Sequence, residues 1–196
     1  MPDLVVIGSV EAASGATGSS SMEVSFSGIT KSDFQEIWVQ AHLKMNTGHA
    51  GSESSGSNLV VYVSDSNVSC NGYASQMGGN TISNYTLTGS TSFQPPTRMT
   101  PGDTTTDASN FNQIFEMIIR NPGEVQVGTS DYAQCTMEIV SGGPQKVIQW
   151  GGSSYGNSMT WGALRADQVD YVKLDIDGSN ENFGEPSRMD VYGWKY

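Results

Sequence analysis

The Gly- and Ser-rich stretch before residue 157 contains a pattern that could supply a nucleophile. Gly152 to Gly156 fit the G-x-S-x-G motif, with Ser154 in the place of the reacting serine. The motif also needs a buried strand before it, a helix after it and a histidine that deprotonates the serine. Both histidines, His42 and His49, come earlier in the chain, and no helical pattern follows. We interpret the match as a chance occurrence in a chain rich in glycine and serine. We therefore predict that the protein has no catalytic residue and is not an enzyme.

Oxygen-bearing side chains gather around a turn near the carboxyl end. Ca²⁺ prefers such ligands, but the glycine of this turn falls two positions too early for an EF-hand, and the glutamate at its twelfth position is missing. A calcium site and a solvated hairpin end both stay open, and we assign no metal ligand. The side chains are Asp170, Asp175, Asp177, Asn180 and Glu181.

The remaining metal-ligating residue types are sparse. His42 and His49 stand seven residues apart, with no third histidine and no cysteine pair at ligand spacing. Cys70 and Cys135 are the only cysteines, and two isolated thiols favour buried or reduced side chains, with pairing left open. Glycine-rich stretches such as 51–56 lack the lysine of a phosphate loop. We therefore predict no cofactor and no metal.

Aromatic residues offer one binding chemistry. Four tryptophans and eight tyrosines could form a platform on which sugar rings stack, as in carbohydrate-binding β-sandwich modules. Aromatic side chains of an all-β protein more often fill a core or an interface. Both interpretations stay open for Trp38, Trp150, Trp161 and Trp194.

The elements that must position these residues are strands. Of 196 residues only 36% are apolar and 15% are charged, and 23 are glycine. Such a composition favours short strands joined by turns, and it lacks the charged faces that amphipathic helices need. We predict an all-β chain.

Alternating apolar residues mark several strands. Met22, Val24 and Phe26 fall on one face of a strand, and a turn leads to a strand at Ile37–Leu43, so the two form a hairpin or a corner between sheets. The nearly continuous apolar run Leu59–Val63 predicts a central strand buried on both faces. Further strands are expected at Leu4–Val10, Thr81–Thr88, Phe111–Ile119, Asp131–Val140, Lys146–Trp150, Val169–Ile176 and the chain end.

The intervening segments are expected to be turns and wide loops. Asn67–Asn80 is rich in turn residues, and Ser90–Asn110 contains three prolines that cannot donate to a strand ladder. Eight to ten strands at this spacing favour a two-sheet antiparallel sandwich of jelly-roll type with long loops over a tight barrel. We see no internal repeat and no long linker, so residues 1–196 are predicted to form a single β-sandwich domain.

The charge balance excludes some partners. Nine basic against twenty acidic residues give a net charge of −11. Nucleic acids and anionic membranes bind clustered cations, so neither is expected as a partner. No basic leader and no apolar stretch of membrane-spanning length is present, which predicts synthesis in a cytoplasm.

Three segments suggest a family. They are SMEVSFSGITKSDFQEIWVQ (Ser21–Gln40), IIRNPG (Ile118–Gly123), and the closing strand–loop–strand from Val169 that contains Phe183 and ends near Val191-Tyr192-Gly193. The chain resembles the jelly-roll virion proteins of tailed bacteriophages, whose last strand often finishes on a Tyr-Gly pair. It departs from them at Trp38 and in the proline-containing segment 90–110.

The resemblance implies a non-enzymatic virion structural protein, made in the host cytoplasm and carried on the particle. Its first implied role is a capsid decoration (cement) protein that stabilises the head, with the major capsid protein or other virion proteins as partners and a homotrimer as the oligomer. The alternative is a phage tail fibre, or a receptor-binding or carbohydrate-binding β-sandwich module.

Overall fold

Extended backbone accounts for nearly all regular structure in the computed structural model. The single exception among the residues described is a short 3-10 turn, η1 (Lys31–Asp33). No helix in this part of the chain is long and apolar enough to cross a membrane. The predicted all-β class is therefore confirmed. The structure describes residues 3–14, 18–44, 58–63, 71–78, 81–88, 92–93, 112–120, 122, 135–142, 158–164, 170–177 and 182–195.

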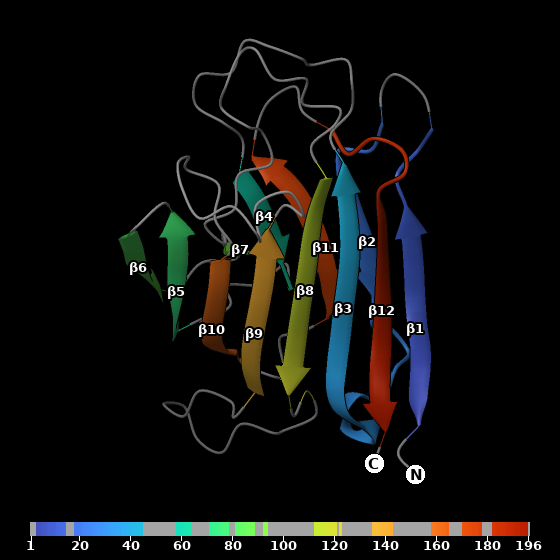
Figure 1. Ribbon diagram of the computed structural model, residues 1–196. Helices are drawn as coiled ribbons and strands as arrows, with labels where there is room; N and C mark the ends of the chain where they lie inside the picture. Colours follow the sequence, from blue (N-terminus) through green and yellow to red (C-terminus); the bar gives the residue numbers. More distant parts are fainter. Residues whose placement is uncertain are drawn as a thin grey trace.

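Two antiparallel sheets pack against each other, with the larger sheet in front in Figure 1. The larger sheet has eight strands in the order β1 (Leu4–Glu11), β12 (Arg188–Lys195), β3 (Phe34–Lys44), β8 (Asn112–Arg120), β9 (Cys135–Gly142), β10 (Ser158–Leu164), β5 (Asn71–Gly78) and β6 (Thr81–Thr88). The smaller sheet has four strands in the order β2 (Ser21–Ser25), β11 (Tyr171–Asp177), β4 (Asn58–Tyr62) and β7 (Ser92–Phe93).

Eight of these strands are connected as a jelly roll. In chain order they are β1, β2, β3, β4, β7, β8, β11 and β12, and the first pairs with the last, the second with the seventh, the third with the sixth and the fourth with the fifth. This nested pairing is that of one long antiparallel hairpin wrapped into two facing sheets. The predicted jelly-roll-like sandwich is confirmed.

The other four strands enlarge only one of the two sheets. β5 and β6 lie in the chain between β4 and β7, and β9 and β10 lie between β8 and β11. Each is an antiparallel pair, and the two pairs join side by side through β10 and β5. Because β9 also pairs with β8, they continue the jelly-roll sheet outward beyond the smaller sheet (Figure 1).

The core lies between the sheets and follows the two-residue period of the strands. On β3 the odd-numbered residues from Ile37 to Leu43 are buried, whereas Gln40 and His42 between them are exposed. Opposite them, alternate residues of β2 and β11 point inward from the smaller sheet. The fully buried side chains include Met22, Ile37, Leu43, Leu59, Phe115, Met117, Ile119 and Phe183.

A group of hydrogen bonds around the buried Ser187 closes one end of the sandwich. The Ser187 hydroxyl accepts from the backbone N–H of Lys44 at 2.8 Å and donates to its carbonyl at 2.9 Å. The Ser187 carbonyl accepts from the N–H of Ala12 at 2.9 Å, and the Lys44 carbonyl also accepts from Gly184. The ends of β1, β3 and β12 are thus tied together where the sequence shows only a polar loop.

The structure decides how β2 connects to β3 and how deeply β4 is buried. β2 lies in the smaller sheet and β3 in the larger one, so the tight connection after Phe26 is a corner between sheets and not a hairpin. Val60 and its neighbours Leu59 and Val61 are all buried, and their strand, β4, lies between β11 and β7. The prediction of a central strand buried on both faces is confirmed.

One segment prediction is wrong. Asn67–Asn80 contains the strand β5, although its Gly, Ser and Asn residues favour turns. β5 pairs on both sides, with β10 and β6, and this pairing outweighs its weak intrinsic preference for extended structure. The strand at Ser158–Leu164 was not anticipated either. The expected strand at Lys146–Trp150 falls outside the described residues.

Candidate functional site on the outer face of the jelly-roll sheet

The outer face of β1, β12, β3 and β8 is the surface on which described side chains could bind another molecule. Even-numbered residues of β3, β8 and β12 point outward here, because their odd-numbered neighbours fill the core. The strand register aligns these outward side chains into four rows that run across the sheet. The rows are Leu4–Trp194–Glu36–Arg120, Val6–Tyr192–Trp38–Ile118, Ser9–Asp190–Gln40–Glu116 and Glu11–Arg188–His42–Ile114.

The first two rows form a mainly apolar band, which we call the aromatic strip. Val6 and Leu4, on the edge strand β1, are 63% and 50% exposed. Large apolar side chains that point to solvent from neighbouring strands are unusual unless another surface covers them. The aromatic strip consists of Leu4, Val6, Trp38, Ile118, Tyr192 and Trp194.

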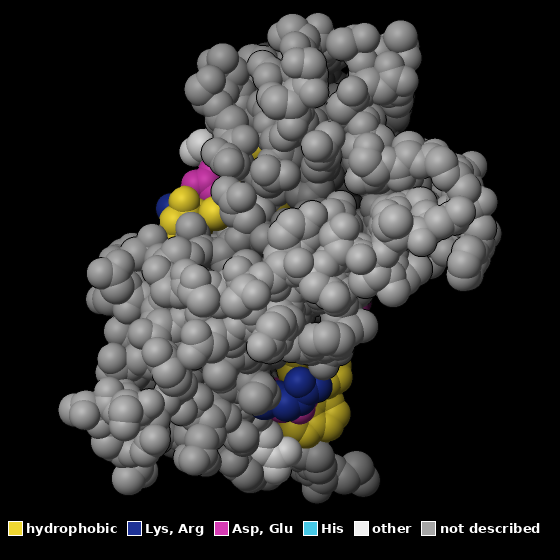
Figure 2. All heavy atoms as spheres, turned by 90° about the vertical axis from the view of Figure 1, so that its left-hand side faces the viewer, with side chains coloured by type: hydrophobic (Ala, Val, Ile, Leu, Met, Phe, Trp, Pro, Cys, Tyr) yellow, Lys and Arg dark blue, Asp and Glu magenta, His cyan; other side chains and the backbone are white. Residues whose placement is uncertain are grey.

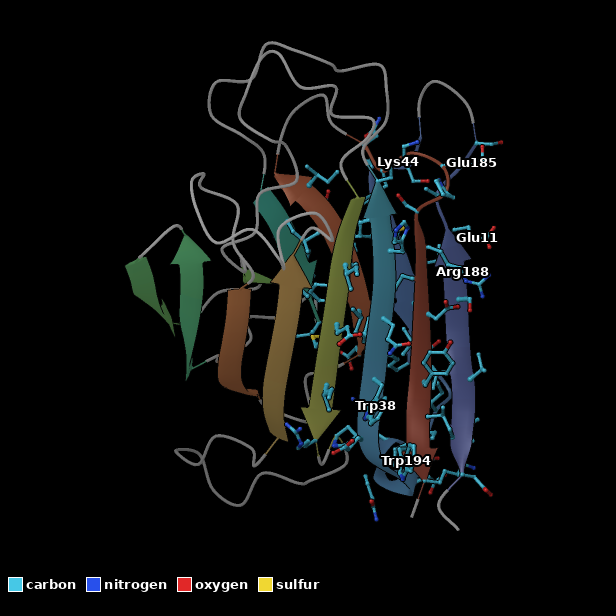
Figure 3. All side chains as sticks on the ribbon, viewed as in Figure 1. Glu11, Trp38, Lys44, Glu185, Arg188 and Trp194 are labelled. Atoms are coloured by element: carbon cyan, nitrogen blue, oxygen red, sulfur yellow. The ribbon has the colours of Figure 1, made fainter. Side chains whose placement is uncertain are left out.

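Two tryptophans form the centre of the aromatic strip. The rings of Trp38 and Trp194 stack with their centroids 5.6 Å apart and their planes inclined by 23°. Both lie near the lower ends of β3 and β12 in Figure 3. The Trp38 indole N–H donates to a carboxylate oxygen of Glu36 at 2.5 Å, and the other oxygen of Glu36 lies 3.3 Å from Nε of Arg120. The indole N–H and the carboxylate beside it are therefore already paired.

The other two rows are polar apart from Ile114, and Arg188 forms most of the hydrogen bonds within them. Its guanidinium donates to both carboxylate oxygens of Asp190, at 2.8 to 3.0 Å, and to Glu11 at 3.0 Å. The hydroxyl of Ser9 also donates to Asp190. Arg188 and Glu11 lie together on β12 and β1 toward the upper end of the sheet in Figure 3. These four side chains link β12 to the edge strand β1.

This network shifts the pKa of both partners in the direction expected for an ion pair. The hydrogen bond from Arg188 lowers the pKa of Asp190 below its usual 3.8, partial burial opposes the shift, and the hydroxyl of Ser9 assists it. The hydrogen bond to Asp190 also raises the pKa of Arg188 above its ordinary value. Both groups are held in their charged forms.

An open hollow of about 250 Å³ lies on this face among the polar rows. Its rim holds an imidazole, a guanidinium, an amide and two carboxylates, so it could take a small polar group. The volume is below the roughly 300 to 1,000 Å³ typical of ligand pockets. The side chains around it are Gln40, His42, Ile114, Glu116, Arg188 and Asp190.

The acidic turn does not assemble as one calcium site from the residues described. Asp170 immediately precedes β11 and Asp175 lies five residues further along the extended chain, which separates their backbones by roughly 17 Å at the usual rise of a strand. Asp170 pairs with Lys31 at 3.8 Å, and Asp175 lies 3.9 Å from Lys173. The side chain of Asp177 and residues 180–181 fall outside the described part. No group of three metal-ligating side chains occurs within that part.

The other candidates from the sequence are only partly described. His42 lies on the outer face beside the hollow, whereas His49, the motif around Ser154 and Trp150 fall outside the described residues. Cys70 is outside as well. Trp161 lies on β10 and Cys135 on β9, in strands whose side-chain positions are not described.

Sequence reasoning missed the Arg188 network and the alignment of Leu4 and Val6 with the tryptophans. The spacing Arg188, Asp190, Tyr192, Trp194 does indicate that the four side chains share one face. What it does not indicate is the neighbouring strand, because β1 lies almost the full chain length away in sequence.

Comparisons with known proteins identify no relative. No protein-family model matches the chain, and no curated protein or solved structure matches it. The fold class therefore rests on the strand connections, and a function has to be argued from the outer face.

Proposed function

We propose that this chain is a non-enzymatic structural protein of a bacteriophage virion, with capsid decoration as its role. The observation that carries the proposal is an outward-facing band of apolar and aromatic side chains on a jelly-roll sheet. Jelly rolls recur in viral capsid proteins and in lectins, and one fold serves many functions. The aromatic strip supports a role in which this face binds the surface of another protein.

The polar rows support a binding role over a catalytic one. Arg188 and Asp190 are engaged with each other, which leaves neither group poised to transfer a proton near neutral pH. Among the described residues, none forms a hydrogen bond with the His42 imidazole that would orient this ring as a general base. The charge of −11 argues against phosphate backbones as the partner.

The copy number of the chain in purified particles tests the role. Quantitative mass spectrometry should find it in many copies, in a fixed ratio to the major capsid protein, and electron microscopy should place it on the head. A few copies confined to the tail would support the fibre alternative and contradict decoration. Absence from particles would refute a virion role.

Light scattering of the purified protein tests the homotrimer, which we keep as the first expectation.

A second candidate is recognition of carbohydrate, which the neighbouring tryptophans and the polar hollow favour. Sugar rings stack on an open aromatic face. In this pair, however, the rings of Trp38 and Trp194 face each other, so each covers one face of the other. Only the outward faces would be available to a sugar, which makes the pair better suited to protein contact.

A glycan array read together with tryptophan fluorescence separates the two candidates. Binding of a defined glycan that quenches the fluorescence, and that is lost on Trp194→Ala, would establish the carbohydrate function. An array without signal above background would remove it.

A further inference from the structure

We propose that the aromatic strip and the acidic side chains beside it form one docking surface for a second protein, whose contact area has an apolar centre and a basic border. This inference rests on the proposed function, in that the partner is a neighbouring protein of the same particle. It specifies which face of this chain the partner covers and which kinds of side chain the partner must supply.

The aromatic strip supplies the centre of the contact. Its exposed members Leu4 and Val6 come from the edge strand, and its half-buried tryptophans come from the next two strands, so the strip crosses β1, β12 and β3. Tryptophan and tyrosine are enriched among the residues that dominate binding energy at protein interfaces. Figure 2 views the molecule from the β6 side, away from the edge strand β1, and there the described residues show only small surface patches in which hydrophobic side chains lie beside charged ones.

The charges within this centre can be covered at low cost. Glu36 accepts from the indole of Trp38 and lies against Arg120, so neither the carboxylate nor the indole N–H would lose its partner when water leaves. Burial of an unpaired charge is expensive, whereas a charge that already has hydrogen bonds tolerates it. The centre is therefore ready to be desolvated.

The border is acidic, which sets the chemistry of the partner. Glu11, Asp190 and Glu116, which we call the acidic border, stand in the rows next to the strip, and Arg188 is the guanidinium among them. Arg188 is shared between Glu11 and Asp190, while Glu116 has no ion-pair partner among the described residues. Three carboxylates against one guanidinium leave this side of the surface negative, and basic side chains complement it.

A second copy of the chain fits this surface less well. Each copy has twenty acidic and nine basic residues, so two copies repel each other at a distance. Arg120 and Arg188 on this face are each already paired with a carboxylate, and would not be available to the acidic border of another copy. A basic partner is attracted by the same field.

Particles assembled with variant chains test the proposal. Val6→Asp places a charge in the exposed centre, and Ser25→Asp places the same charge on the outer face of β2 in the other sheet as the matched control. Glu116→Lys reverses one charge of the acidic border. Each purified variant is first checked for an unchanged denaturation midpoint. Copies per particle are then measured by mass spectrometry after washes of rising salt, and the free proteins are studied by sedimentation velocity.

The expected result is a loss of about tenfold or more in occupancy for Val6→Asp, with Ser25→Asp like wild type. Glu116→Lys should lower the number of copies per particle. Washes of rising salt should also remove more of the wild-type protein from the particles, because salt screens the attraction between the acidic border and a basic partner. Val6→Asp at wild-type occupancy would overturn this inference alone. Tighter binding of Glu116→Lys would overturn the inference that the partner is basic. An oligomer of the free protein that Val6→Asp disrupts and Ser25→Asp does not would show that a second copy of the chain covers the surface. Wild type missing from particles would overturn both this inference and the proposed function.

Discussion

Gly193 lies on β12 where no side chain can be accommodated, and Gly193→Ala should destabilise the protein. A Cβ at this position would lie 2.2, 2.3 and 2.8 Å from Cε1, Cδ1 and Cζ of Phe34. Carbon atoms in contact normally stand 3.5 to 4.0 Å apart. The Phe34 ring is buried, so a new methyl group requires it to move by more than 1 Å against the residues that cover it. Overpacking of this kind costs about 1 to 3 kcal/mol.

A double-mutant cycle in guanidinium chloride tests the cause as well as the size of the effect. Phe34→Ala alone should cost about 3 to 5 kcal/mol through the cavity that it leaves. In that background Gly193→Ala should cost little, which gives a coupling free energy of about 1 to 3 kcal/mol between the two positions. The dependence of the unfolding free energy on denaturant should stay constant, because the buried area hardly changes.

Two results would refute this reasoning. Gly193→Ala with the wild-type denaturation midpoint would show that the close approach of β12 to Phe34 is not present in the folded protein. An equal cost of Gly193→Ala with and without the Phe34 ring would show that some other contact opposes the new methyl group.

Three further outcomes are expected. Ser187→Ala should cost about 1 to 3 kcal/mol in denaturant unfolding, because it removes the buried hydroxyl that accepts from the part-buried backbone N–H of Lys44; a cost near zero would contradict this. Asp190→Asn should be slightly less stable than wild type near neutral pH. The difference should shrink as the pH falls below about 4, because a lowered pKa stabilises the fold only while the carboxylate is charged, so a difference that grows in acid would argue against the pairing with Arg188. Gly28→Ala should cost about 1 to 2 kcal/mol, measured as a lower midpoint, since Gly28 has a φ of +79° with open space around it; Gly28→Asn should cost less.

Parts of the core were readable in the sequence because burial alternates along a strand. Met22, Val24 and Phe26 were predicted to share a face, and all three are buried. The same period accounts for the outward position of Trp38 between Ile37 and Val39, which the sequence alone had left open. A pattern of this kind is local, so it can be recognised without knowledge of the partner strand.

The prediction failed where pairing outweighed composition. The Gly- and Ser-containing segment Asn71–Gly78 forms a strand because two neighbours supply its backbone hydrogen bonds. The Ser187 cluster was also hidden, since its hydroxyl bonds to Lys44, which is 143 residues away in the chain. Neither interaction leaves a local mark in the sequence.

By itself the sequence determined many of the extended elements, and for strands such as β2 and β3 it also determined the buried face, because side chains alternate across a strand with a period of two residues. Only the tertiary structure decided that Val6 stands beside Tyr192, and Tyr192 beside Trp38. That alignment depends on how the long hairpin wraps and on the register of each pair. Since it joins residues from opposite ends of the chain, the aromatic strip and its acidic border exist only in the folded protein.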